Sequence, residues 1–225
     1  RVIKNEDKLV SEIGLGTWQF CNNSSWNGPN KKKAIEMVKT AYELGCNFFD
    51  TAPNYSNGES ELILGKAVNS LNIRKDVFIN TKFGHWPNGN IDFNPERIRE
   101  SVLKSLERLD TNYIDSLILH NPSEKILKGK TKHFEILKNL KEEGLINYFG
   151  VSVDTSKEMI DVIKNTNIDI IEVIFNMIHQ ESKKAFELAK KENISIIVKV
   201  PLDSGWLTGK YNKKSSFKGI RDRWS

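Results

Sequence analysis

The sequence predicts an α/β fold in which a parallel sheet closes into a TIM-type (β/α)8 barrel. Short apolar runs alternate with amphipathic stretches along the chain, as they do where helices connect parallel strands. The unit of one strand and one helix recurs roughly every 25 to 40 residues, the length of a βα unit. The runs have the uniformly apolar character of strands buried on both faces. No G-x-G-x-x-G follows the first run, which disfavours a doubly wound dinucleotide-binding sheet.

The expected elements follow one another in a regular order. The strands are expected at residues 12–17, 46–50, 77–82, 113–120, 146–152, 170–176 and 194–201. The helices are expected at residues 31–44, 62–71, 95–109, 134–143, 157–164 and 183–192, where apolar residues recur at helical spacing. Gly45 can cap the end of the first helix, and Pro95 marks the start of the third. Ser60 is a candidate N-cap of the second.

Seven strands do not close the usual eight-stranded barrel. The residues after Tyr211 are polar and show no apolar period. We therefore expect one domain over residues 1–225 that is incomplete at its C-terminal end. The eighth βα unit is expected to lie in sequence beyond Ser225, or to have been disordered or removed.

The composition excludes several classes of protein. No apolar run approaches the ~20 residues that a membrane helix needs, and the charged start lacks the apolar segment of a signal peptide. The net charge of +5 is spread out, without aromatic interleaving or a nucleic-acid motif. Two cysteines are too few for a disulfide scaffold. No pair of the four histidines has the spacing of metal ligands. These features predict a cytoplasmic protein without nucleic-acid, membrane or metal partners.

Four polar residues lie at or just after the ends of three successive strands. Asp50 ends the second strand and Tyr55 follows it closely, while Lys82 and His120 end the third and fourth. The carboxyl ends of parallel strands meet at one mouth of a barrel, where active sites form. We therefore expect Asp50, Tyr55, Lys82 and His120 to form a catalytic group.

These residue types match the needs of carbonyl reduction. The carbonyl oxygen must receive a proton, and a tyrosine can donate it although its ordinary pKa near ~10 is high. A neighbouring ammonium lowers that pKa, and a carboxylate balances the buried ammonium. An imidazole can orient the carbonyl or assist proton transfer. Tyr55, Lys82, Asp50 and His120 can fill these roles in that order.

The chain resembles the aldo-keto reductases over essentially its whole length. The stretches that carry the resemblance are residues 11–18, 49–55, 58–65, 81–84, 115–120, 144–152 and 201–210. The resemblance implies a barrel enzyme that reduces aldehydes or ketones with NADPH and without metal. It implies that Tyr55 is the general acid, that Lys82 and Asp50 tune it, and that His120 positions the carbonyl.

The resemblance also assigns the cofactor contacts. Thr17, Trp18 and Asp50 are expected near the nicotinamide, and Ser152 at its carboxamide. The segment 201–210 is expected over the pyrophosphate, where its glycines allow close approach of the backbone. Its assigned residues are Pro201, Leu202, Ser204, Gly205, Leu207, Gly209 and Lys210.

The chain departs from the family pattern at the cofactor site. Lys199 stands where an aromatic ring usually stacks on the nicotinamide, and Glu172 stands where a glutamine usually binds the carboxamide, while Asn176 is retained. We assign all three to the cofactor. The residues that contact the 2′-phosphate in the family lie largely beyond Ser225, so NADH remains an alternative to NADPH.

Aromatic residues are candidates for the substrate pocket. Trp18, Trp26 and Trp86 follow strand ends, where they could wall an apolar pocket beside His120, although core packing explains them equally well. His85 is a further candidate lining residue.

Two other functions compete with carbonyl reduction of a small-molecule substrate. One is a nicotinamide-nucleotide-binding regulatory subunit of a protein complex with little turnover. The other is an aldolase or isomerase that uses Lys82 as a Schiff base.

Overall fold

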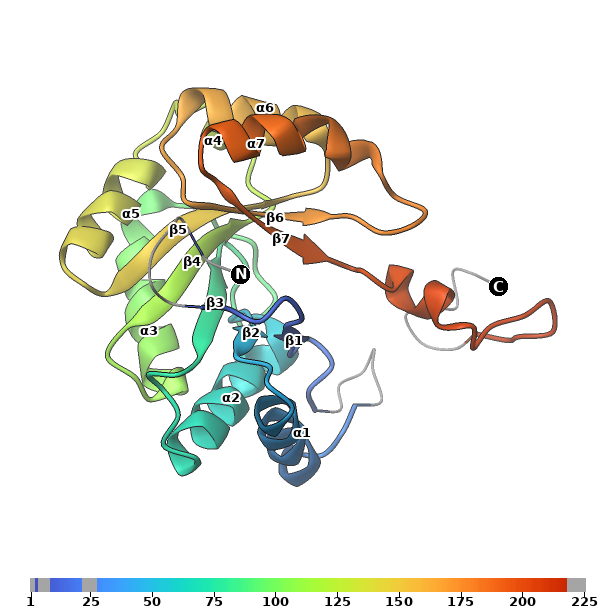
Figure 1. The fold of residues 1–225 in the computed structure, drawn as a ribbon. Coiled ribbons are helices and arrows are strands. Elements are labelled where there is room, and N and C mark those ends of the chain that lie inside the picture. Colours follow the sequence, from blue (N-terminus) through green and yellow to red (C-terminus); the bar gives the residue numbers. More distant parts are fainter. Residues whose placement is uncertain (1–2, 4–8, 22–27, 218–225) are drawn as a thin grey trace.

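The computed structural model describes residue 3 and residues 9–21 and 28–217, which form a curled, seven-stranded parallel sheet (Figure 1). The strands pair in chain order, each parallel to the next. They are β1 (Leu15–Gly16), β2 (Phe48–Asp50), β3 (Phe78–Phe83), β4 (Ile114–His120), β5 (Ile146–Val153), β6 (Ile170–Ile174) and β7 (Ser195–Lys199). The strand–helix alternation predicted from the sequence is confirmed.

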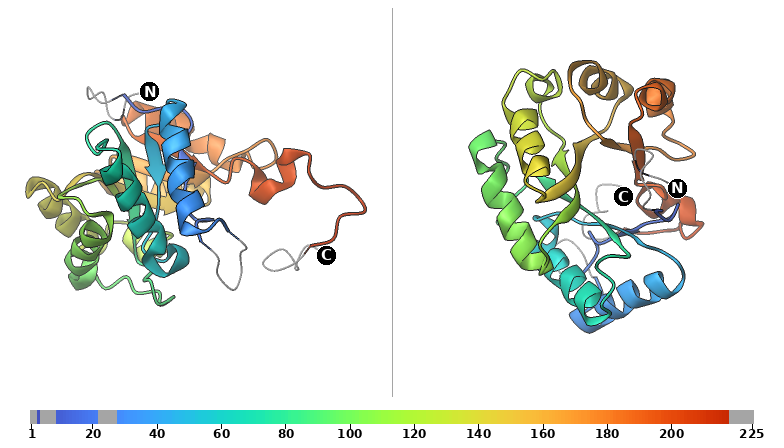
Figure 2. Two further views of the ribbon diagram at one scale, coloured as in Figure 1. Left: turned by 90° about the horizontal axis from the view of Figure 1, so that it is seen from below. Right: turned by 60° about the vertical axis from the view of Figure 1, so that its left-hand side comes forward.

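Helices surround the sheet on its outer, convex side (Figure 2). The α-helices are α1 (Lys31–Glu43), α2 (Glu59–Ser70), α3 (Ile98–Leu109), α4 (Glu124–Leu127), α5 (His133–Glu142), α6 (Ser156–Asn165) and α7 (Phe186–Lys191). Short 3-10 helices are η1 (Tyr55–Gly58), η2 (Pro95–Arg97), η3 (Glu181–Ala185) and η4 (Asp203–Thr208). In the part of the chain that is described, no helix has the length and apolar character to cross a membrane.

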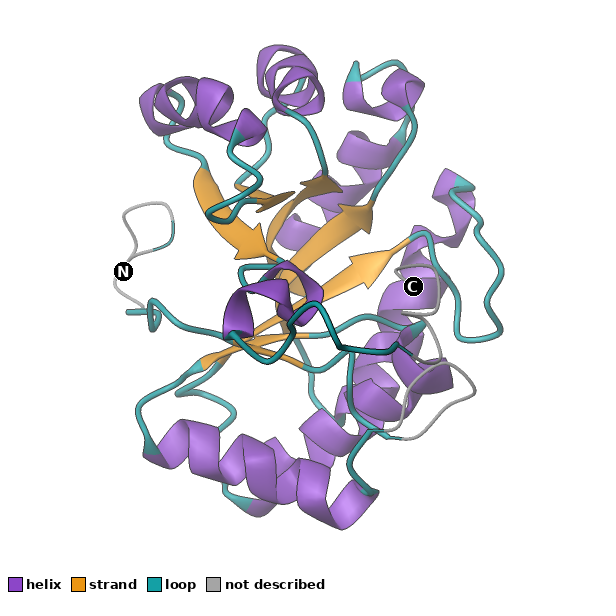
Figure 3. Ribbon diagram, turned by 90° about the vertical axis from the view of Figure 1, so that its right-hand side faces the viewer, coloured by secondary structure: helices purple, strands orange, loops and turns teal. Residues whose placement is uncertain are grey.

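The sheet is a half-barrel. Among the described residues β7 pairs only with β6, and β1 pairs only with β2. The segment after β7, which carries η4, projects away from the sheet at the right of Figure 1 and faces the viewer in Figure 3.

Alternating residues of the strands pack against two different surroundings. Outward side chains such as Phe49, Ile79 and Val151 join the large core beneath the helices. Inward side chains at the amino ends of the strands form a second apolar cluster, the floor of the half-barrel, built from Phe48, Phe78, Tyr148, Ile170, Ile3 and Val10. The rings of Phe48 and Phe78 stack at 5.5 Å, and those of Phe78 and Tyr148 at 5.9 Å. The floor closes the amino end and leaves the carboxyl end for polar residues.

Some local expectations were wrong. The first strand is two residues long rather than six. Just before it, the chain at Gly14 passes so close to the Phe48 ring that a Cβ would lie 2.3 Å from it. Ser60 is not an N-cap: Gly58, in the left-handed region, occupies that position. The Ser60 hydroxyl instead donates to the Thr17 carbonyl at 3.0 Å. Gly45, with φ of 90°, follows the end of α1 as expected.

A buried ion pair joins the second and third helices to the sheet. The carboxylate of Glu61 in α2 accepts from Arg108 Nε in α3 and from Thr81 Oγ1 in β3, both at 2.6 Å. Glu61 is fully buried. Its two partners satisfy both carboxylate oxygens, as a buried charge requires.

Gly65 lets α2 approach the end of α3 closely, and Gly65→Ala is expected to destabilise the protein. An added Cβ would lie 2.4 Å from the Leu109 carbonyl oxygen, so the helices must separate. Overpacking of this kind costs about 1–3 kcal/mol, which the better helix propensity of alanine offsets only in part. Urea unfolding measures the change. Gly16→Ala, where the added Cβ meets nothing within 4 Å, is the control; equal losses in both variants would contradict the close-packing argument.

Candidate active site

The carboxyl ends of the strands bring the four predicted catalytic residues together. Asp50 is the last residue of β2, and Tyr55 begins η1 five residues later. Lys82 is the fifth residue of β3, and His120 is the last residue of β4. The side chains of Asp50, Lys82 and His120 point toward the inner face of the sheet above the apolar floor, because inward positions alternate along each strand. The Tyr55 ring lies beside Lys82 and His120.

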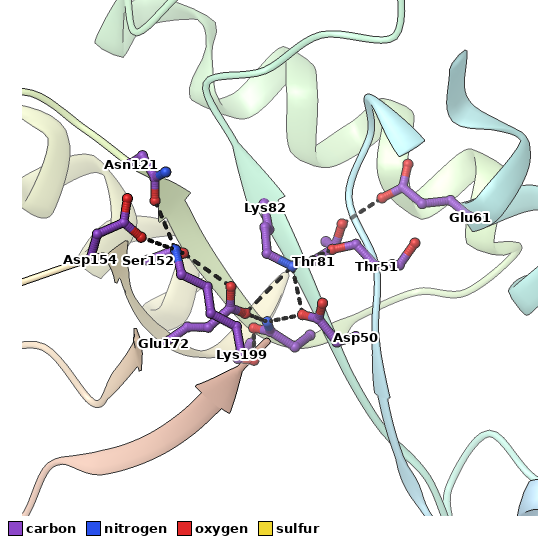
Figure 4. A network of polar contacts seen from close by, with 12 residues as sticks. Asp50, Thr51, Glu61, Thr81, Lys82, Asn121, Ser152, Asp154, Glu172 and Lys199 are labelled. Atoms are coloured by element: carbon purple, nitrogen blue, oxygen red, sulfur yellow. Dashed lines mark hydrogen bonds and ion pairs between the residues drawn. The ribbon is translucent and has the colours of Figure 1, made fainter. Parts of the chain in front are cut away.

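The ammonium of Lys82 is buried and surrounded by acceptors. Lys82 is 1% exposed. Its Nζ donates to Asp50 Oδ1 at 2.6 Å and to the Thr51 carbonyl at 2.9 Å, and it lies 3.5 Å from Glu172 Oε2 (Figure 4). Burial alone would lower the pKa of Lys82, but the carboxylates of Asp50 and Glu172 outweigh it and raise the pKa. Lys82 is therefore a permanent cation at neutral pH.

Tyr55 is a partly buried phenol beside this cation. Lys82 Nζ lies 5.2 Å from the centroid of the Tyr55 ring, and the His120 ring meets that ring edge-on at 6.2 Å. Burial raises the pKa of Tyr55 above its ordinary value, and Lys82 opposes this by favouring the phenolate. Asp50 and Glu172 act against Lys82 by adding negative charge. Tyr55 is accordingly protonated in the resting protein, with one cation placed to assist its ionisation.

His120 is held as a neutral imidazole. Burial, assisted by the charge of Lys82, lowers the pKa of His120 to about 2. The ring of His85 stacks on it at 4.4 Å. His85 is half-buried, and its burial also lowers its pKa. A neutral His120 keeps one N–H donor and one acceptor at the mouth of the half-barrel.

A second group of polar residues joins β5, β6 and β7 to Lys82. Ser152 Oγ donates to Glu172 Oε1 at 3.0 Å and accepts from Lys199 Nζ at 2.8 Å (Figure 4). The same ammonium contacts Asn121 Oδ1 at 3.1 Å and Asp154 Oδ1 at 2.8 Å. The two cations, Lys82 and Lys199, therefore stand at opposite ends of a chain that passes through Glu172 and Ser152.

Sequence reasoning missed Asn80 and Ser116, which complete this polar interior. Asn80 Nδ2 donates to Asp50 Oδ1 at 2.7 Å and lies 3.4 Å from Glu172 Oε2, while the Ser116 hydroxyl donates to Asn80 Oδ1. The register places Asn80 opposite both Asp50 and Ser116. The available signal was a polar residue two positions before Lys82 and therefore on the same face of an otherwise apolar strand.

The other predicted cofactor residues lie around this interior but make different contacts. Thr17 is fully buried, whereas Trp18 is nearly half exposed. The side-chain amide of Asn176 forms hydrogen bonds with the backbone: Nδ2 donates to the Val200 carbonyl at 3.1 Å, and Oδ1 accepts from the backbone N–H groups of Ile178 and His179. The residues assigned within 201–210 lie in and around η4, beyond the end of β7.

The two described pocket tryptophans differ in exposure. Trp86 is buried, with its ring edge-on to Phe83 at 6.4 Å and beneath the guanidinium of Arg97 at 3.9 Å. Trp26 lies outside the described residues. Trp18 therefore remains as an exposed aromatic beside the buried Thr17. In the described ranges, no group of three or more His, Cys, Asp or Glu side chains could hold a metal ion.

Comparison with known proteins identifies the family. A sequence model of the aldo/keto reductase family matches residues 12–225. The chain belongs to that family.

Relatives and solved structures agree with this assignment. The chain is 33% identical over 214 residues to aldo-keto reductase YhdN of Bacillus subtilis, covering 93% of this chain and 64% of that protein. It is 31% identical over 219 residues to the NADH-specific methylglyoxal reductase of Escherichia coli, covering 90% and 67%. The holo form of an aldo-keto reductase from Bacillus halodurans superposes with a TM-score of 0.83 at 28% identity, covering 97% and 72%. The chain thus spans about two thirds of the length of these curated relatives.

Unpartnered buried atoms test whether this site suits a nicotinamide nucleotide and a carbonyl compound. Among the described residues, four buried polar atoms have no hydrogen-bond partner: Thr17 Oγ1, Thr51 Oγ1, Asn54 Oδ1 and His120 Nδ1. All four lie at or just after the carboxyl ends of β1, β2 and β4. Buried polar atoms normally have partners, so their gathering at one mouth fits a polar ligand bound there.

The neutral state of His120 is expected to make stability depend on pH. The unfolded chain protonates this residue below its ordinary pKa of 6.5, but the folded protein does not until about pH 2. The contribution of His120 to stability is therefore full above pH 6.5 and falls as the pH drops through that value. Between pH 7 and 5.5 the loss from His120 is about 1 kcal/mol.

Urea unfolding of the wild type and of His120→Asn at these two pH values measures this loss. His133 is present in both proteins and does not contact His120, so its contribution cancels in the comparison. The variant is expected to lose less stability than the wild type on acidification. Equal losses would show that His120 is not held neutral.

Proposed function

We propose that this protein reduces an aldehyde or ketone to an alcohol by hydride transfer from NADPH, with Tyr55 as the general acid. The observation that carries the proposal is the buried Lys82 ammonium, which lies between the Tyr55 ring and the carboxylate of Asp50. A permanent cation at this place can stabilise negative charge that develops on a neighbour. The phenol is the neighbour that can acquire it.

Each side chain has a defined task in this reaction. NADPH would supply the hydride to the carbonyl carbon. The Tyr55 O–H bond breaks as the carbonyl oxygen takes the proton, and Lys82 stabilises the phenolate that remains. Asp50 keeps Lys82 in place, and neutral His120 can donate one N–H to the carbonyl oxygen. Because His120 carries no charge, it positions the carbonyl without competing with Tyr55 as an acid.

The nucleotide is proposed to lie at the ends of β5 to β7. Ser152, Glu172 and Lys199 would face the nicotinamide, with Thr17, Trp18 and Asn176 beside it, and residues from Pro201 to Lys210 would cover the pyrophosphate. The name of the Escherichia coli relative specifies NADH, so NADH is the alternative to test. The two free cysteines, Cys21 and Cys46, favour a reducing compartment, and we propose a cytoplasmic location.

The geometry argues against Schiff-base chemistry at Lys82. A nucleophilic lysine must be neutral, usually because a hydrophobic or cationic environment lowers its pKa. Lys82 instead contacts two carboxylates, and its pKa is raised.

Tyr55→Phe is expected to abolish carbonyl reduction and to leave nucleotide binding nearly unchanged. Loss of a positioned general acid costs typically about 10²–10⁴-fold in rate, whereas the aromatic packing of residue 55 is kept. Steady-state turnover and quenching of intrinsic fluorescence by NADPH measure the two effects. Tyr113→Phe, at a phenol packed beneath Arg74, is the matched control. Wild-type turnover in Tyr55→Phe would rule out the proposed acid, and tight binding without turnover in the wild type would favour a regulatory subunit.

NADPH is expected to stabilise the folded protein more than NADH does. A ligand that binds only the native state raises stability by RT ln(1 + [L]/Kd), about 2.7 kcal/mol at a hundredfold excess over Kd. Thermal-shift curves with each nucleotide at one concentration make the comparison, with AMP as a control for general nucleotide binding. A larger shift with NADH would reverse the proposed preference.

A further inference from the structure

The Lys82 ammonium has three N–H donors and more than three candidate acceptors. Asp50 Oδ1 and the Thr51 carbonyl take two donors, at 2.6 and 2.9 Å. The third N–H can turn toward Glu172 Oε2, which lies 3.5 Å away, or toward the Tyr55 phenol. Glu172 and Tyr55 therefore compete for one donor.

Glu172 is placed by its own partners and not by Lys82 alone. It is 3% exposed and lies on β6, opposite Ser152 of β5. Ser152 Oγ holds Oε1 at 3.0 Å, and Asn80 Nδ2 lies 3.4 Å from Oε2. Because these neutral groups fix the carboxyl, it stays beside Lys82 whether or not it carries a charge.

The charged groups around Glu172 come from four strands. Asp50 of β2 repels its carboxylate, whereas Lys82 of β3 and Lys199 of β7 attract it. Lys199 acts through Ser152 and is itself paired with Asp154 at the end of β5. His120 of β4 is neutral. Burial and Asp50 together outweigh the two cations and raise the pKa of Glu172 toward neutrality.

We propose that Glu172 is a positioning residue that acts through Lys82: as a second buried carboxyl group on that ammonium, it competes with Tyr55, and its protonation releases Lys82 to support the phenolate. This inference rests on the proposed function, since it concerns the proton that Tyr55 donates. When Glu172 is ionised, Lys82 is shared and Tyr55 is a weaker acid. When Glu172 is protonated, Tyr55 is a stronger acid, and reduction is faster.

The pH profile of turnover in Glu172→Gln tests the inference. The ionised carboxylate of Glu172 is expected to raise the pKa of Tyr55 by about one, which makes the phenol a weaker acid. In the wild type, kcat/KM for carbonyl reduction is therefore expected to fall by about tenfold as the pH rises through neutrality. The variant keeps the shape of the side chain but cannot ionise, so its profile is expected to be flat over the same range. Glu61→Gln, which removes another fully buried carboxylate outside the half-barrel, is expected to keep the wild-type profile.

Melting of the protein without nucleotide gives a second readout. A carboxyl group whose folded pKa is raised contributes stability below its ordinary pKa of 4.5 and loses it as the pH rises through the folded value. The wild type is therefore expected to lose about 6 °C in Tm relative to Glu172→Gln between pH 5.5 and 8. Glu172→Asp, which keeps a titrating carboxyl group, is expected to retain this loss.

The outcomes distinguish a failure of the role proposed for Glu172 from a failure of the role proposed for Tyr55. Parallel pH profiles and parallel melting curves for the wild type and Glu172→Gln would overturn the role of Glu172, even if Tyr55→Phe is inactive. If Tyr55→Phe keeps full turnover, the proposed acid fails. In that case a pH-dependent difference in Tm between the wild type and Glu172→Gln would show only that Glu172 titrates. The proposed effect of Glu172 on Tyr55 would be overturned, because Tyr55 would not be the general acid.

Discussion

The structure depends on one buried charge, the ammonium of Lys82. An unpaired ion in the interior would cost several kcal/mol. Three oxygen atoms surround the Lys82 ammonium: Asp50 Oδ1 of β2, the carbonyl of Thr51 just after β2, and Glu172 Oε2 of β6. The strand register makes this possible: Asp50 stands opposite Asn80, two residues before Lys82 on the same face of β3. Lys82 then reaches back across the pair to Asp50. A one-residue slip would turn Lys82 out into the apolar core beneath the helices.

The outward face of the strands packs against the helices, and the inward face carries the polar residues of the candidate site. Outward residues such as Ile79, Thr81 and Phe83 face α2 and α3, and even the polar member of this set is satisfied by buried Glu61. Inward residues change from aromatic to polar along one strand, from Phe78 through Asn80 to Lys82. The floor of stacked rings makes the lower half of the half-barrel apolar. The polar groups above it therefore interact in a medium where each charge has large effects.

The sequence predicted those features that depend on position along a single strand. Apolar runs located all seven strands, and strand ends located Asp50, Lys82 and His120, because parallel strands place their carboxyl ends together. Features that depend on two strands at once were missed. Asn80 is an ordinary polar residue until the register sets it between Asp50 and Ser116. The two-residue length of β1 and the contact of Ser60 with Thr17 follow from how closely separate segments approach, which no local pattern records.

The residues at positions 172 and 199 belong to one electrostatic arrangement. In the pattern that the sequence resembles, these positions hold a neutral glutamine and an aromatic ring; here they hold an acid and a base joined through the Ser152 hydroxyl. Exchanging both neutral residues for opposite charges leaves the net charge of the interior unchanged. Exchanging either one alone would change that net charge by one. The two departures therefore balance each other in charge. Together they add a titratable group to a site in which Lys82 stays charged and His120 stays uncharged at neutral pH.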